Sequence, residues 1–501
     1  MDALPDIVRR AAEAHPDHPA VIFHGRVTTY ADLDRLVDRT AAALNDLGIG
    51  KGDRVAILLG NIPEFVYAFH GTLRLGAVAT PINAMLTPEE LGYVLADAEA
   101  QAIIVAIDLV PAVLAVRDRL GSLDHILVVG PPPTPPGTRS FDDALDRARK
   151  IPAVDVRRDD LAVLAYTAGT TDQPKGAMLS HGNLLANLEQ VSAVPALKEA
   201  GSDVALIALP LFHIYALNAA LNLVLMEGAA AIIVDRFDPV ATLELVPRHG
   251  VTILFGVPQM FQAWLAAARR GESDLSTVRL AVSGAAPLPG SVLAEFEERF
   301  DCTIWEGYGL TETAPVVTTN ALGEAARADS IGLPLPGVEV RILDEDGTDV
   351  VEGDPGEILV RGSNVFKGYW RRPEETDEAF TEGWLRTGDI AYRDEDGYLF
   401  LVDRSKDLII VSGFNVYPRE VEEALAAHPS VVEAAVIGVP DERTGEAIRA
   451  FVVASGEVSV EELLEHCRGR LARFKLPRDV ELVESLPRHS TGKVVRRSFR
   501  E

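Results

Sequence analysis

The first third of the chain alternates between short apolar runs and segments whose apolar residues recur at helical spacing. The helical pattern at 31–48 is followed by the apolar run RVAILLG at 54–60, and the alternation continues to the run AIIVA at 102–106. Short apolar runs that alternate with helices are typical of parallel strands covered on both faces. The pattern therefore predicts an α/β fold, with a large N-terminal domain built mainly on parallel sheets.

The pattern changes near residue 404. A proline-led helix is predicted within 412–431, the segments 431–441 and 447–455 read as the strands of a hairpin, and 461–474 carries a second helical pattern. These elements predict a smaller α+β domain at the C-terminal end. A chain of 501 residues is also too long for one compact core, which favours two or more domains.

Two unusual stretches do not change this organisation. The proline-rich stretch 131–137 is predicted to be a surface loop inside the large domain, because strands and helices alternate again after it. The apolar stretch 217–234 is interrupted by Asn218, Asn222 and Glu227, which predicts a buried helix and a strand rather than a membrane span. Residues 1–20 have no apolar core of signal-peptide length. We therefore expect no transmembrane segment.

The charge balance narrows the possible partners. The formal net charge is −28, with 75 acidic residues against 47 lysines and arginines. Such an acidic chain disfavours nucleic acid and anionic membranes as partners. The two cysteines, Cys302 and Cys467, lie far apart without metal-ligand spacing, which is typical of a reducing compartment. These features favour a cytoplasmic enzyme that acts on small molecules.

The segment YTAGTTDQPKG at 166–176 carries the strongest chemical signal. An apolar run at 161–166 precedes it and a helical pattern follows Ser180, so it is predicted to be a loop between two rigid elements. Its glycines let the backbone approach an anion, its threonines and amides can donate to phosphate oxygens, and Lys175 supplies positive charge. The lysine stands between proline and glycine, unlike the P-loop of kinases and GTPases. The segment therefore predicts ATP binding by another enzyme class.

At this loop the sequence resembles the acyl-adenylate-forming superfamily of acyl-CoA synthetases, luciferases and peptide-synthetase adenylation domains. The superfamily loop usually reads Ser/Thr-Ser-Gly-Ser/Thr-Thr-Gly-x-Pro-Lys-Gly, whereas this chain has Ala168 in place of a serine and Asp172 in place of a glycine. At about 4 Å and an effective dielectric constant of about 20, two like charges repel by roughly 4 kcal/mol. The resemblance therefore implies that Asp172 points to solvent or toward a cation when ATP binds.

A second motif, GYGLTE at 307–312, agrees with this resemblance, and its glycines predict that its aromatic, hydroxyl and carboxylate side chains lie within one turn. Tyr308 can stack on a purine, and Glu312 is a hard oxygen ligand suited to magnesium. The superfamily uses the matching glutamate for the metal, so the resemblance implies Mg²⁺ at Thr170 and Glu312. Asp389, in the TGD motif at 387–389, matches the residue that accepts hydrogen bonds from both ribose hydroxyls.

The C-terminal motifs imply a mobile small domain. The charged run 403–407 matches the superfamily hinge, which gives a large AMP-binding domain at 1–402, a hinge that turns about Lys406, and a small domain at 408–501. Lys493, in the motif at 487–497, matches the catalytic lysine of adenylation. The resemblance implies that CoA contacts Ser412, Gly413 and Phe414.

The acyl group has candidate residues of its own. A strand within 205–215 stops at a proline and presents His213, in the recurrent motif PLFH, whose histidine borders the acyl pocket in the superfamily. Peptide-synthetase domains usually carry an aspartate there, so His213 argues against an α-amino acid substrate. Glu306 would repel a second carboxylate if it faced the pocket, which disfavours dicarboxylic acids such as malonate.

The implied site residues fall into groups. ATP or AMP is expected at Thr167, Gly169, Thr170, Thr171, Lys175, Gly284, Ala285, Ala286, Glu306, Gly307, Tyr308, Gly309, Thr311, Asp389 and Arg404. The acyl pocket is expected at His213, Ile214, Gly256, Val257, Gly284 and Gly309. Catalytic roles are expected for Lys493, Glu312, Lys175 and His213.

The resemblance implies an AMP-forming acid–thiol ligase. With ATP and Mg²⁺ the enzyme would convert a fatty or aryl acid to an acyl adenylate, and CoA would then take the acyl group, giving acyl-CoA, AMP and pyrophosphate. An acyl carrier protein is the alternative acceptor, and the oligomeric state stays open between monomer and homodimer. A catalytically dead adenylate-binding regulator is disfavoured, because Lys493, Glu312 and Asp389 are all retained.

Overall fold

The structure is a computed structural model of the 501-residue chain. It describes residues 1, 3–148, 154–167, 173–198, 200–271, 273–344, 346–404, 409–411, 414–441, 444–471, 473–488 and 494–499.

Contacts divide the chain into two compact units. The first unit comprises Met1–Ala328, Gly332–Glu339 and Arg361–Leu385. The second unit comprises Asp329–Ile331, Val340–Val360 and Arg386–Glu501. The second unit thus includes the predicted small domain and segments that precede it in the chain. The boundary at 402 and the hinge at 403–407 stay predictions, because 405–407 lie outside the described residues.

The largest sheet of the first unit has nine strands in the order β16-β15-β14-β13-β12-β10-β11-β1-β2. Its central pairs, from β1 to β14, are parallel, and its outer pairs β1/β2, β14/β15 and β15/β16 are antiparallel. The strands are β1 (Pro19–Phe23), β2 (Arg26–Thr29), β10 (Val204–Ile207), β11 (Ala230–Ile233), β12 (Ile253–Gly256), β13 (Leu280–Ser283), β14 (Ile304–Gly309), β15 (Val316–Thr319) and β16 (Leu333–Pro334).

A seven-stranded sheet, also in the first unit, has the order β7-β6-β5-β3-β4-β8-β9. The strands are β3 (Arg54–Leu58), β4 (Val78–Pro81), β5 (Ala102–Ala106), β6 (His125–Val129), β7 (Arg139–Ser140), β8 (Leu161–Thr167) and β9 (Lys175–Ser180). All its pairs are parallel except β8/β9. The predicted fold class, a parallel α/β domain, is therefore confirmed for this part of the chain.

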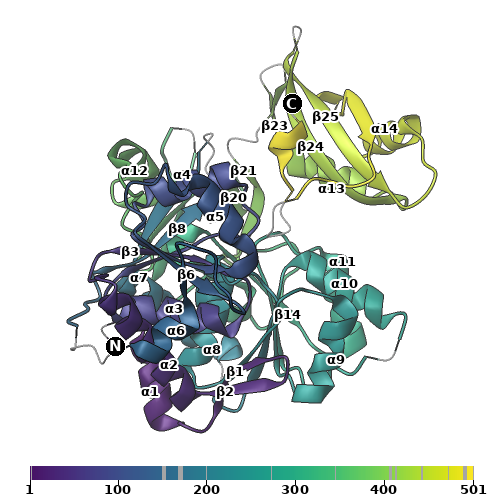
Figure 1. The fold of residues 1–501 in the computed structure, drawn as a ribbon. Coiled ribbons are helices and arrows are strands. Elements are labelled where there is room, and N and C mark those ends of the chain that lie inside the picture. The colour runs from purple at the N-terminus through teal and green to yellow at the C-terminus, as the bar shows by residue number, and fades with distance from the viewer. Residues whose placement is uncertain are drawn as a thin grey trace. The chain divides into compact units, whose positions relative to one another are not determined.

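Helices cover these sheets, and Figure 1 shows α9, α10 and α11 side by side next to β14. The helices of the first unit are α1 (Asp6–Ala14), α2 (Tyr30–Asp46), α3 (Pro63–Arg74), α4 (Pro88–Asp97), α5 (Val110–Arg117), α6 (Phe141–Arg147), α7 (His181–Ser192), α8 (Leu223–Met226), α9 (Pro239–His249), α10 (Pro258–Ala268), α11 (Gly290–Phe300) and α12 (Pro373–Ala379). The start of helix α4 shows how the sequence determines where a helix begins. Thr87 and Glu90 form a capping box at the start of α4, where Pro88 takes the first helical position.

A π-helix, η3 (Tyr215–Asn222), precedes α8 in the apolar stretch that the sequence marks as a helix and a strand. Long π-helices are rare, and short π segments are often found at functional sites. The asparagines that interrupt the apolar run, Asn218 and Asn222, are fully buried. The stretch ends in β11, so the prediction of a buried helix followed by a strand is confirmed.

Two smaller sheets complete the described fold. One has the order β17-β18-β20-β19 with β21 beside β20, from β17 (Val338–Leu343), β18 (Gly356–Gly362), β19 (Phe380–Thr381), β20 (Trp384–Arg393) and β21 (Leu399–Arg404). The other has the order β23-β22-β25-β24 with β26 beside β25, from β22 (Ile409–Val411), β23 (Phe414–Val416), β24 (Val431–Asp441), β25 (Gly445–Ala454) and β26 (Asp479–Leu482). Helices α13 (Pro418–Ala426) and α14 (Val460–Arg468) pack on it around Val436, Leu425 and Leu463. This α+β unit carries the predicted hairpin, β24/β25.

Three local predictions need correction. The helical pattern at 461–474 gives a shorter helix, α14, which ends at Arg468. The loop at 166–176 does not run directly from a strand into a helix, because strand β9 intervenes and pairs back on β8. The motif GYGLTE is not one turn, because β14 extends to Gly309 and only Thr311–Thr313 form a 3₁₀ turn, η4.

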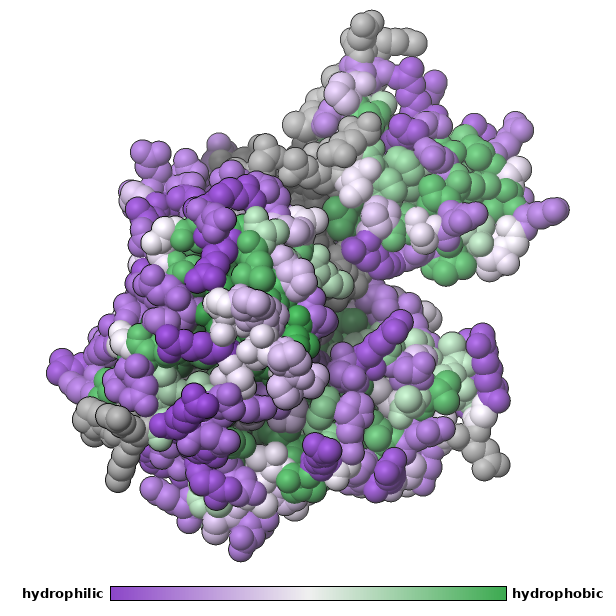
Figure 2. Space-filling view, in the orientation of Figure 1, coloured by the Kyte–Doolittle hydropathy of each residue, from purple (hydrophilic) through white to green (hydrophobic). Residues whose placement is uncertain are grey.

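The charged residues of the sequence suggest a largely hydrophilic surface. Figure 2 shows hydrophilic residues over much of the visible face, with apolar residues interspersed. None of the helices in the described parts of the chain combines the length and the apolar character that a membrane crossing requires.

Buried histidines should make the first unit acid-sensitive. Burial lowers the pKa of His181 to about 4 and that of His70 to about 3. The unfolded chain binds these protons below pH about 6.5, whereas the folded chain excludes them, so stability falls as pH drops from about 6.5 to 4. Each histidine contributes a slope of up to about 1.4 kcal/mol per pH unit. Urea unfolding followed by tryptophan fluorescence measures this slope, because all four tryptophans lie in the first unit.

His181→Gln should reduce the slope by about one proton, since glutamine can still accept the hydrogen bond from the Leu4 N–H, 3.1 Å from His181 Nδ1. His18→Gln, at an exposed histidine, is the matched control and should keep the slope that His181 and His70 produce. Equal slopes in the wild type and His181→Gln would contradict the explanation.

Candidate active site

The two ends of the phosphate loop are held by an antiparallel strand pair. Thr167, the last residue of β8, lies opposite Lys175, the first residue of β9. Both side chains are half-buried. The loop residues between them that carry the predicted phosphate contacts, Gly169, Thr170 and Thr171, lie outside the described residues, as do Ala168 and Asp172. The structure therefore defines the stems of the loop.

Helix α4 anchors both stems through its last turn. Asp97, with a side chain only 11% exposed, accepts hydrogen bonds from the Tyr166 hydroxyl at 2.7 Å and from the Arg372 guanidinium at 2.9 Å. The Tyr93 hydroxyl donates to the Pro174 carbonyl at 3.1 Å, and Arg372 also donates to Tyr93 Oη at 3.1 Å. Tyr166 precedes the loop and Pro174 follows it, so one helix face fixes both of its ends.

The segment 367–372 runs along the other side of β9. Its backbone hydrogen bonds to β9 are Met178 N to Gly368 O at 3.0 Å, Lys367 N to Met178 O at 2.9 Å and Trp370 N to Gly176 O at 2.8 Å. Gly368 has a φ of 113°, and a Cβ there would meet Thr376 Cγ2 at 2.4 Å, so only glycine fits. The pairing places Tyr369 directly opposite Ala177.

Tyr369 brings two predicted site residues together. Its hydroxyl donates to Glu312 Oε1 at 2.8 Å, and the Lys175 ammonium lies 5.3 Å from its ring centroid, within cation–π range. Burial, and secondarily the Glu312 carboxylate, raises the pKa of Tyr369. The phenol therefore stays protonated at neutral pH and serves as a hydrogen-bond donor.

Glu312 lies in the tight turn that follows β14. Gly309 is required there, because a Cβ at that position would meet the Pro315 carbonyl oxygen at 1.8 Å. The Thr313 hydroxyl closes the turn by donating to the Pro315 carbonyl at 2.5 Å and accepting from the Leu310 N–H at 3.1 Å, and the Phe366 N–H donates to the Glu312 carbonyl at 2.8 Å. The backbone of Glu312, the candidate metal ligand, is therefore held both by hydrogen bonds within the turn and by the N–H of Phe366.

Buried asparagine side chains connect this turn to its surroundings. They lie on α7, on η3 and in the segment before Phe366, and their amides donate to backbone carbonyls. The contacts are Asn364 to Thr313 at 2.8 Å, Asn187 to Val316 at 2.7 Å, Asn218 to Ala314 at 2.7 Å and Asn183 to Val365 at 2.7 Å. A buried amide without its partner costs about 1–3 kcal/mol, so these contacts favour one arrangement of the turn.

The carboxyl ends of β12, β13 and β14 meet around Tyr215. The Tyr215 hydroxyl lies 3.1 Å from the Val282 carbonyl and 3.3 Å from the Gly256 carbonyl, and burial raises its pKa, so it donates. A Cβ at Gly284 would lie 3.4 Å from the Tyr215 ring and 3.5 Å from the Gly307 carbonyl. The structure therefore gathers three predicted site glycines around a side chain that sequence reasoning missed.

The remaining candidates for the acyl group and the nucleotide lie in the segments that follow β10, β12 and β13. His213 and Ile214 directly precede Tyr215, and the His213 and Phe212 rings are in contact at 4.4 Å. Ile214 and Val257 are buried, Ala286 is half-buried, and Ala285 is exposed with a positive φ of 68°. The pocket roles of these residues stay predictions.

Glu306 and Tyr308 both lie on β14 and are buried. Glu306 Oε1 accepts a hydrogen bond from the Leu288 N–H at 3.2 Å, in the turn after β13. Tyr308 lies opposite Thr318 of β15. Glu306 therefore contributes to shaping the turn, whereas its predicted repulsion of a second carboxylate stays untested.

In the second unit the strand pair β20/β21 brings two residues predicted to contact ATP or AMP, Asp389 and Arg404, together. Asp389 lies opposite Arg404 in the register, is 6% exposed, and its N–H lies 3.1 Å from Thr387 Oγ1. The described residues include only the backbone placement of Arg404 and Phe414. The remaining predicted residues, Lys406, Ser412, Gly413 and Lys493, lie outside the described residues.

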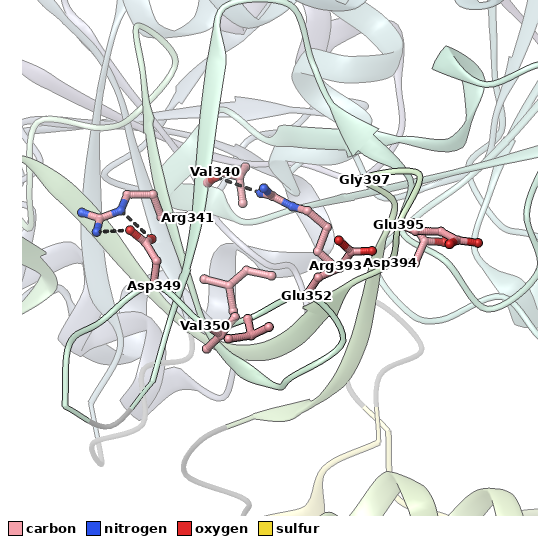
Figure 3. Close-up of a pocket in the computed structure, with 11 residues that line it drawn as sticks. Val340, Arg341, Asp349, Val350, Glu352, Arg393, Asp394, Glu395 and Gly397 are labelled. Atoms are coloured by element: carbon pink, nitrogen blue, oxygen red, sulfur yellow. Dashed lines mark hydrogen bonds and ion pairs between the residues drawn. The ribbon is translucent and has the colours of Figure 1, made fainter.

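A surface cavity in the second unit is separate from these residues. It encloses about 400 Å³ between β17, β20 and the turns that follow them, and Figure 3 shows its lining. Arg341 pairs with Asp349 at 2.8 Å, and Arg393 donates to the Val340 carbonyl at 3.0 Å. None of the predicted site residues lines it, so its position does not support a catalytic role.

Residues 8–370 match the AMP-binding enzyme family, and residues 420–493 match the AMP-binding enzyme C-terminal domain. The chain belongs to the AMP-binding enzyme family. A long-chain-fatty-acid–CoA ligase of Yersinia pestis is 40% identical, over 100% of this chain and 94% of the relative. A feruloyl-CoA synthase of an Amycolatopsis species is also 40% identical, over 98% of this chain and 97% of the relative.

A solved structure extends the match to three dimensions. The anthranilate CoA ligase AuaEII, in complex with anthranoyl-AMP, is 30% identical with a TM-score of 0.91, over 99% of this chain and 96% of that one. The family and fold predicted from the motifs are therefore confirmed. This AMP-binding enzyme is an adenylate-forming acid–thiol ligase, as its CoA-ligase relatives indicate.

Four residues that contact the site were missed by the sequence analysis: Tyr369, Asp97, Arg372 and Tyr215. Tyr369 is 57 residues from Glu312 and Asp97 is 69 residues from Tyr166, so no local pattern links either pair. The glycine before Tyr369 was the available signal, because a glycine between large residues often marks a close backbone approach.

Removing the Asp97 carboxylate should loosen the phosphate loop. Asp97→Ala leaves Tyr166 and Arg372 without their shared acceptor, which should cost about 2–3 kcal/mol of stability. The KM for ATP should rise by about 3- to 10-fold, since the loop stems lose their common anchor. Steady-state kinetics at varied ATP and urea unfolding measure the two effects.

Glu99→Ala is the matched control, because Glu99 is an acidic residue two positions away that pairs with Arg54 and Arg371 at 45% side-chain exposure. It should change stability by no more than about 0.5 kcal/mol and leave the KM unchanged. An unaltered KM for ATP in Asp97→Ala would rule out the anchoring role.

Proposed function

We propose that this protein activates a monocarboxylic acid, fatty or aryl, with ATP and transfers the acyl group to CoA. The observation that carries the proposal is the convergence of Lys175, Tyr369 and Glu312 at the foot of the phosphate loop. A cationic group and a metal-ligating carboxylate at this place meet the electrostatic need of the reaction. The relatives of equal identity, one named for long-chain fatty acids and one for feruloyl-CoA, support both acid classes.

The chemistry follows from the charges of the reactants. A carboxylate is repelled by triphosphate, so attack requires alignment and neutralisation of negative charge. One carboxylate oxygen bonds to the α-phosphorus of ATP, and the bond from that phosphorus to pyrophosphate breaks. The CoA thiol then loses its proton and bonds to the acyl carbon, and AMP leaves with the bonding electrons. Lys175 supports the first step by neutralising charge on the phosphates, and Lys493 is the second cation proposed for it.

Glu312 and the loop threonine Thr170 are the residues proposed to hold Mg²⁺. The described residues contain no group of three or more histidine, cysteine, aspartate or glutamate side chains suited to a metal. Mg²⁺ is usually held by one or two carboxylates together with substrate phosphates and waters, so a single carboxylate such as Glu312 is sufficient on the protein side. When bound, the ion would neutralise charge on the triphosphate. Tyr369 orients one Glu312 oxygen, which leaves the carboxylate positioned as an oxygen ligand.

The acyl group is proposed to lie at the ends of β12, β13 and β14. Ile214, Val257 and the Tyr215 ring place apolar side chains there. His213 occupies the position where peptide-synthetase domains usually carry an aspartate, so an α-amino group would lack an anionic partner. An uncharged fatty chain or aromatic ring suits this lining better than an amino acid.

CoA is proposed as the acceptor rather than an acyl carrier protein. Both whole-length relatives are named for CoA products, and the solved anthranilate ligase is a CoA ligase. The acceptor contacts proposed from the sequence are Ser412, Gly413 and Phe414. In this scheme the small domain turns about Lys406 between the two steps.

A panel of acids tests the proposal. Fatty acids of several chain lengths, hydroxycinnamic and benzoic acids, malonate and amino acids are each assayed for pyrophosphate release and for CoA thioester. We expect a fatty or aryl acid to give both products, and malonate and amino acids to give neither. Pyrophosphate release without CoA thioester would favour the carrier-protein acceptor. No pyrophosphate with any carboxylic acid would contradict the proposed function.

A lysine variant identifies the adenylation step within the same assay. Lys493→Ala should lower pyrophosphate release by about 10²–10³, the usual cost of losing one preorganised donor to a developing charge. Supplied with synthetic acyl adenylate, the variant should still form thioester at near the wild-type rate. Lys198→Ala is the control, because it removes an exposed lysine outside the proposed site.

A further inference from the structure

Tyr369 is the described residue that contacts both charged groups proposed to act on the triphosphate. Its hydroxyl lies 2.8 Å from Glu312 Oε1, and its ring faces the Lys175 ammonium at 5.3 Å. A tyrosine that combines a donor hydroxyl with a cation-binding ring can therefore set two opposite charges in one geometry.

The backbone around Tyr369 holds the ring in one place. Ala177 pairs with Tyr369 across the β9 edge, and the Tyr369 N–H donates to Thr376 Oγ1 at 2.9 Å. Phe366 packs edge-on against the ring, with centroids 4.9 Å apart. The same Phe366 donates its N–H to the Glu312 carbonyl, so the tyrosine and the glutamate share one rigid support.

A packing role alone does not account for these contacts of the half-buried Tyr369. A tyrosine that serves only as packing would satisfy its hydroxyl with water or with a backbone carbonyl, as Tyr30 does with the Ala229 carbonyl at 2.6 Å. Tyr369 instead donates to an ionisable carboxylate, and hydrogen bonds to charged groups are about twice as strong as those between neutral groups. The contact restricts one oxygen of Glu312 and thereby the direction of the other.

We propose that Tyr369 is a positioning residue for the ATP half-reaction: its hydroxyl aims the Glu312 carboxylate at the cation of the nucleotide–metal complex, and its ring holds the Lys175 ammonium beside the phosphates. This inference rests on the proposed function and adds a residue to it. The hydroxyl and the ring act on different partners, so their effects on ATP binding are separable.

Tyr369→Phe removes the hydroxyl and keeps the ring. Because the two groups act on different partners, this variant should weaken ATP binding only when Mg²⁺ is present. ATP dissociation constants are measured by calorimetry in EDTA and in saturating Mg²⁺. In EDTA the variant should bind ATP within about twofold of the wild type, because the ring still faces Lys175. In Mg²⁺ the variant should lose about tenfold in affinity, which corresponds to about 1.4 kcal/mol.

Two controls separate positioning from a general structural effect. Tyr30→Phe removes another buried phenol hydrogen bond in the first unit and should leave both dissociation constants unchanged. In a Glu312→Gln background, Tyr369→Phe should add at most about twofold to the loss in Mg²⁺, because the two residues act through one contact. Thioester formation from synthetic acyl adenylate should be unaffected, since that step needs no triphosphate.

The outcomes distinguish the inference from the proposed function. If the wild type releases pyrophosphate with a fatty or aryl acid and Tyr369→Phe binds ATP equally well in Mg²⁺, the positioning role is wrong and the function stands. An equal loss in EDTA and Mg²⁺, or additive losses with Glu312→Gln, also overturns it. Should Tyr369→Phe fail to fold, Glu312→Asp tests the same contact from the other side by withdrawing the carboxylate from the phenol. A Glu312→Asp variant with wild-type affinity in Mg²⁺ would then overturn the role.

Discussion

The antiparallel pairing of β8 with β9 is the constraint on which the candidate site depends. It brings Thr167 and Lys175 opposite each other and thereby closes the phosphate loop at its base. A flexible loop cannot present several donors to a triphosphate unless its ends are fixed, because each unfixed residue costs about 1–2 kcal/mol of backbone entropy on ordering. Helix α4 on one side and the segment 367–372 on the other keep this strand pair in place.

Buried polar side chains make these supports specific. Asp97 joins Tyr166 to Arg372, and the asparagines of α7 and η3 join the Glu312 turn to its surroundings. Each polar group would be costly to bury alone, so the arrangement that satisfies all of them is strongly favoured over slightly displaced ones. The site is therefore preorganised by hydrogen bonds in a low-dielectric interior, where electrostatic stabilisation of a transition state is most effective.

Local patterns were sufficient to predict the fold class and the family, whereas the roles of the site residues stay predictions. The run AIIVA at 102–106 coincides with β5, and the phosphate loop follows the strand β8 as expected. The strand β9 was missed because Lys175–Ser180 contains only three consecutive apolar residues between polar and small ones. Its strand conformation comes from pairing with β8, which is a tertiary effect.

Residues that act across long sequence separations were beyond sequence reasoning. Tyr369 and Asp97 acquire their roles only when 367–372, α4 and β8 meet, and nothing in the spacing of these segments marks the meeting. The π-helical form of η3 was likewise not predictable, since its apolar pattern also fits an α-helix. Motifs therefore identified the groups expected to contact ATP, whereas the groups that position them required the fold.

The acyl-adenylate route requires that an oxygen of the acid attacks the α-phosphorus of ATP. It is tested most directly with an acid whose carboxylate oxygens are both ¹⁸O, by mass spectrometry of the AMP and the thioester after complete turnover with CoA. We expect AMP to carry one labelled oxygen and the thioester to keep the other. AMP without label, or label found in pyrophosphate, would contradict the acyl-adenylate route for this enzyme.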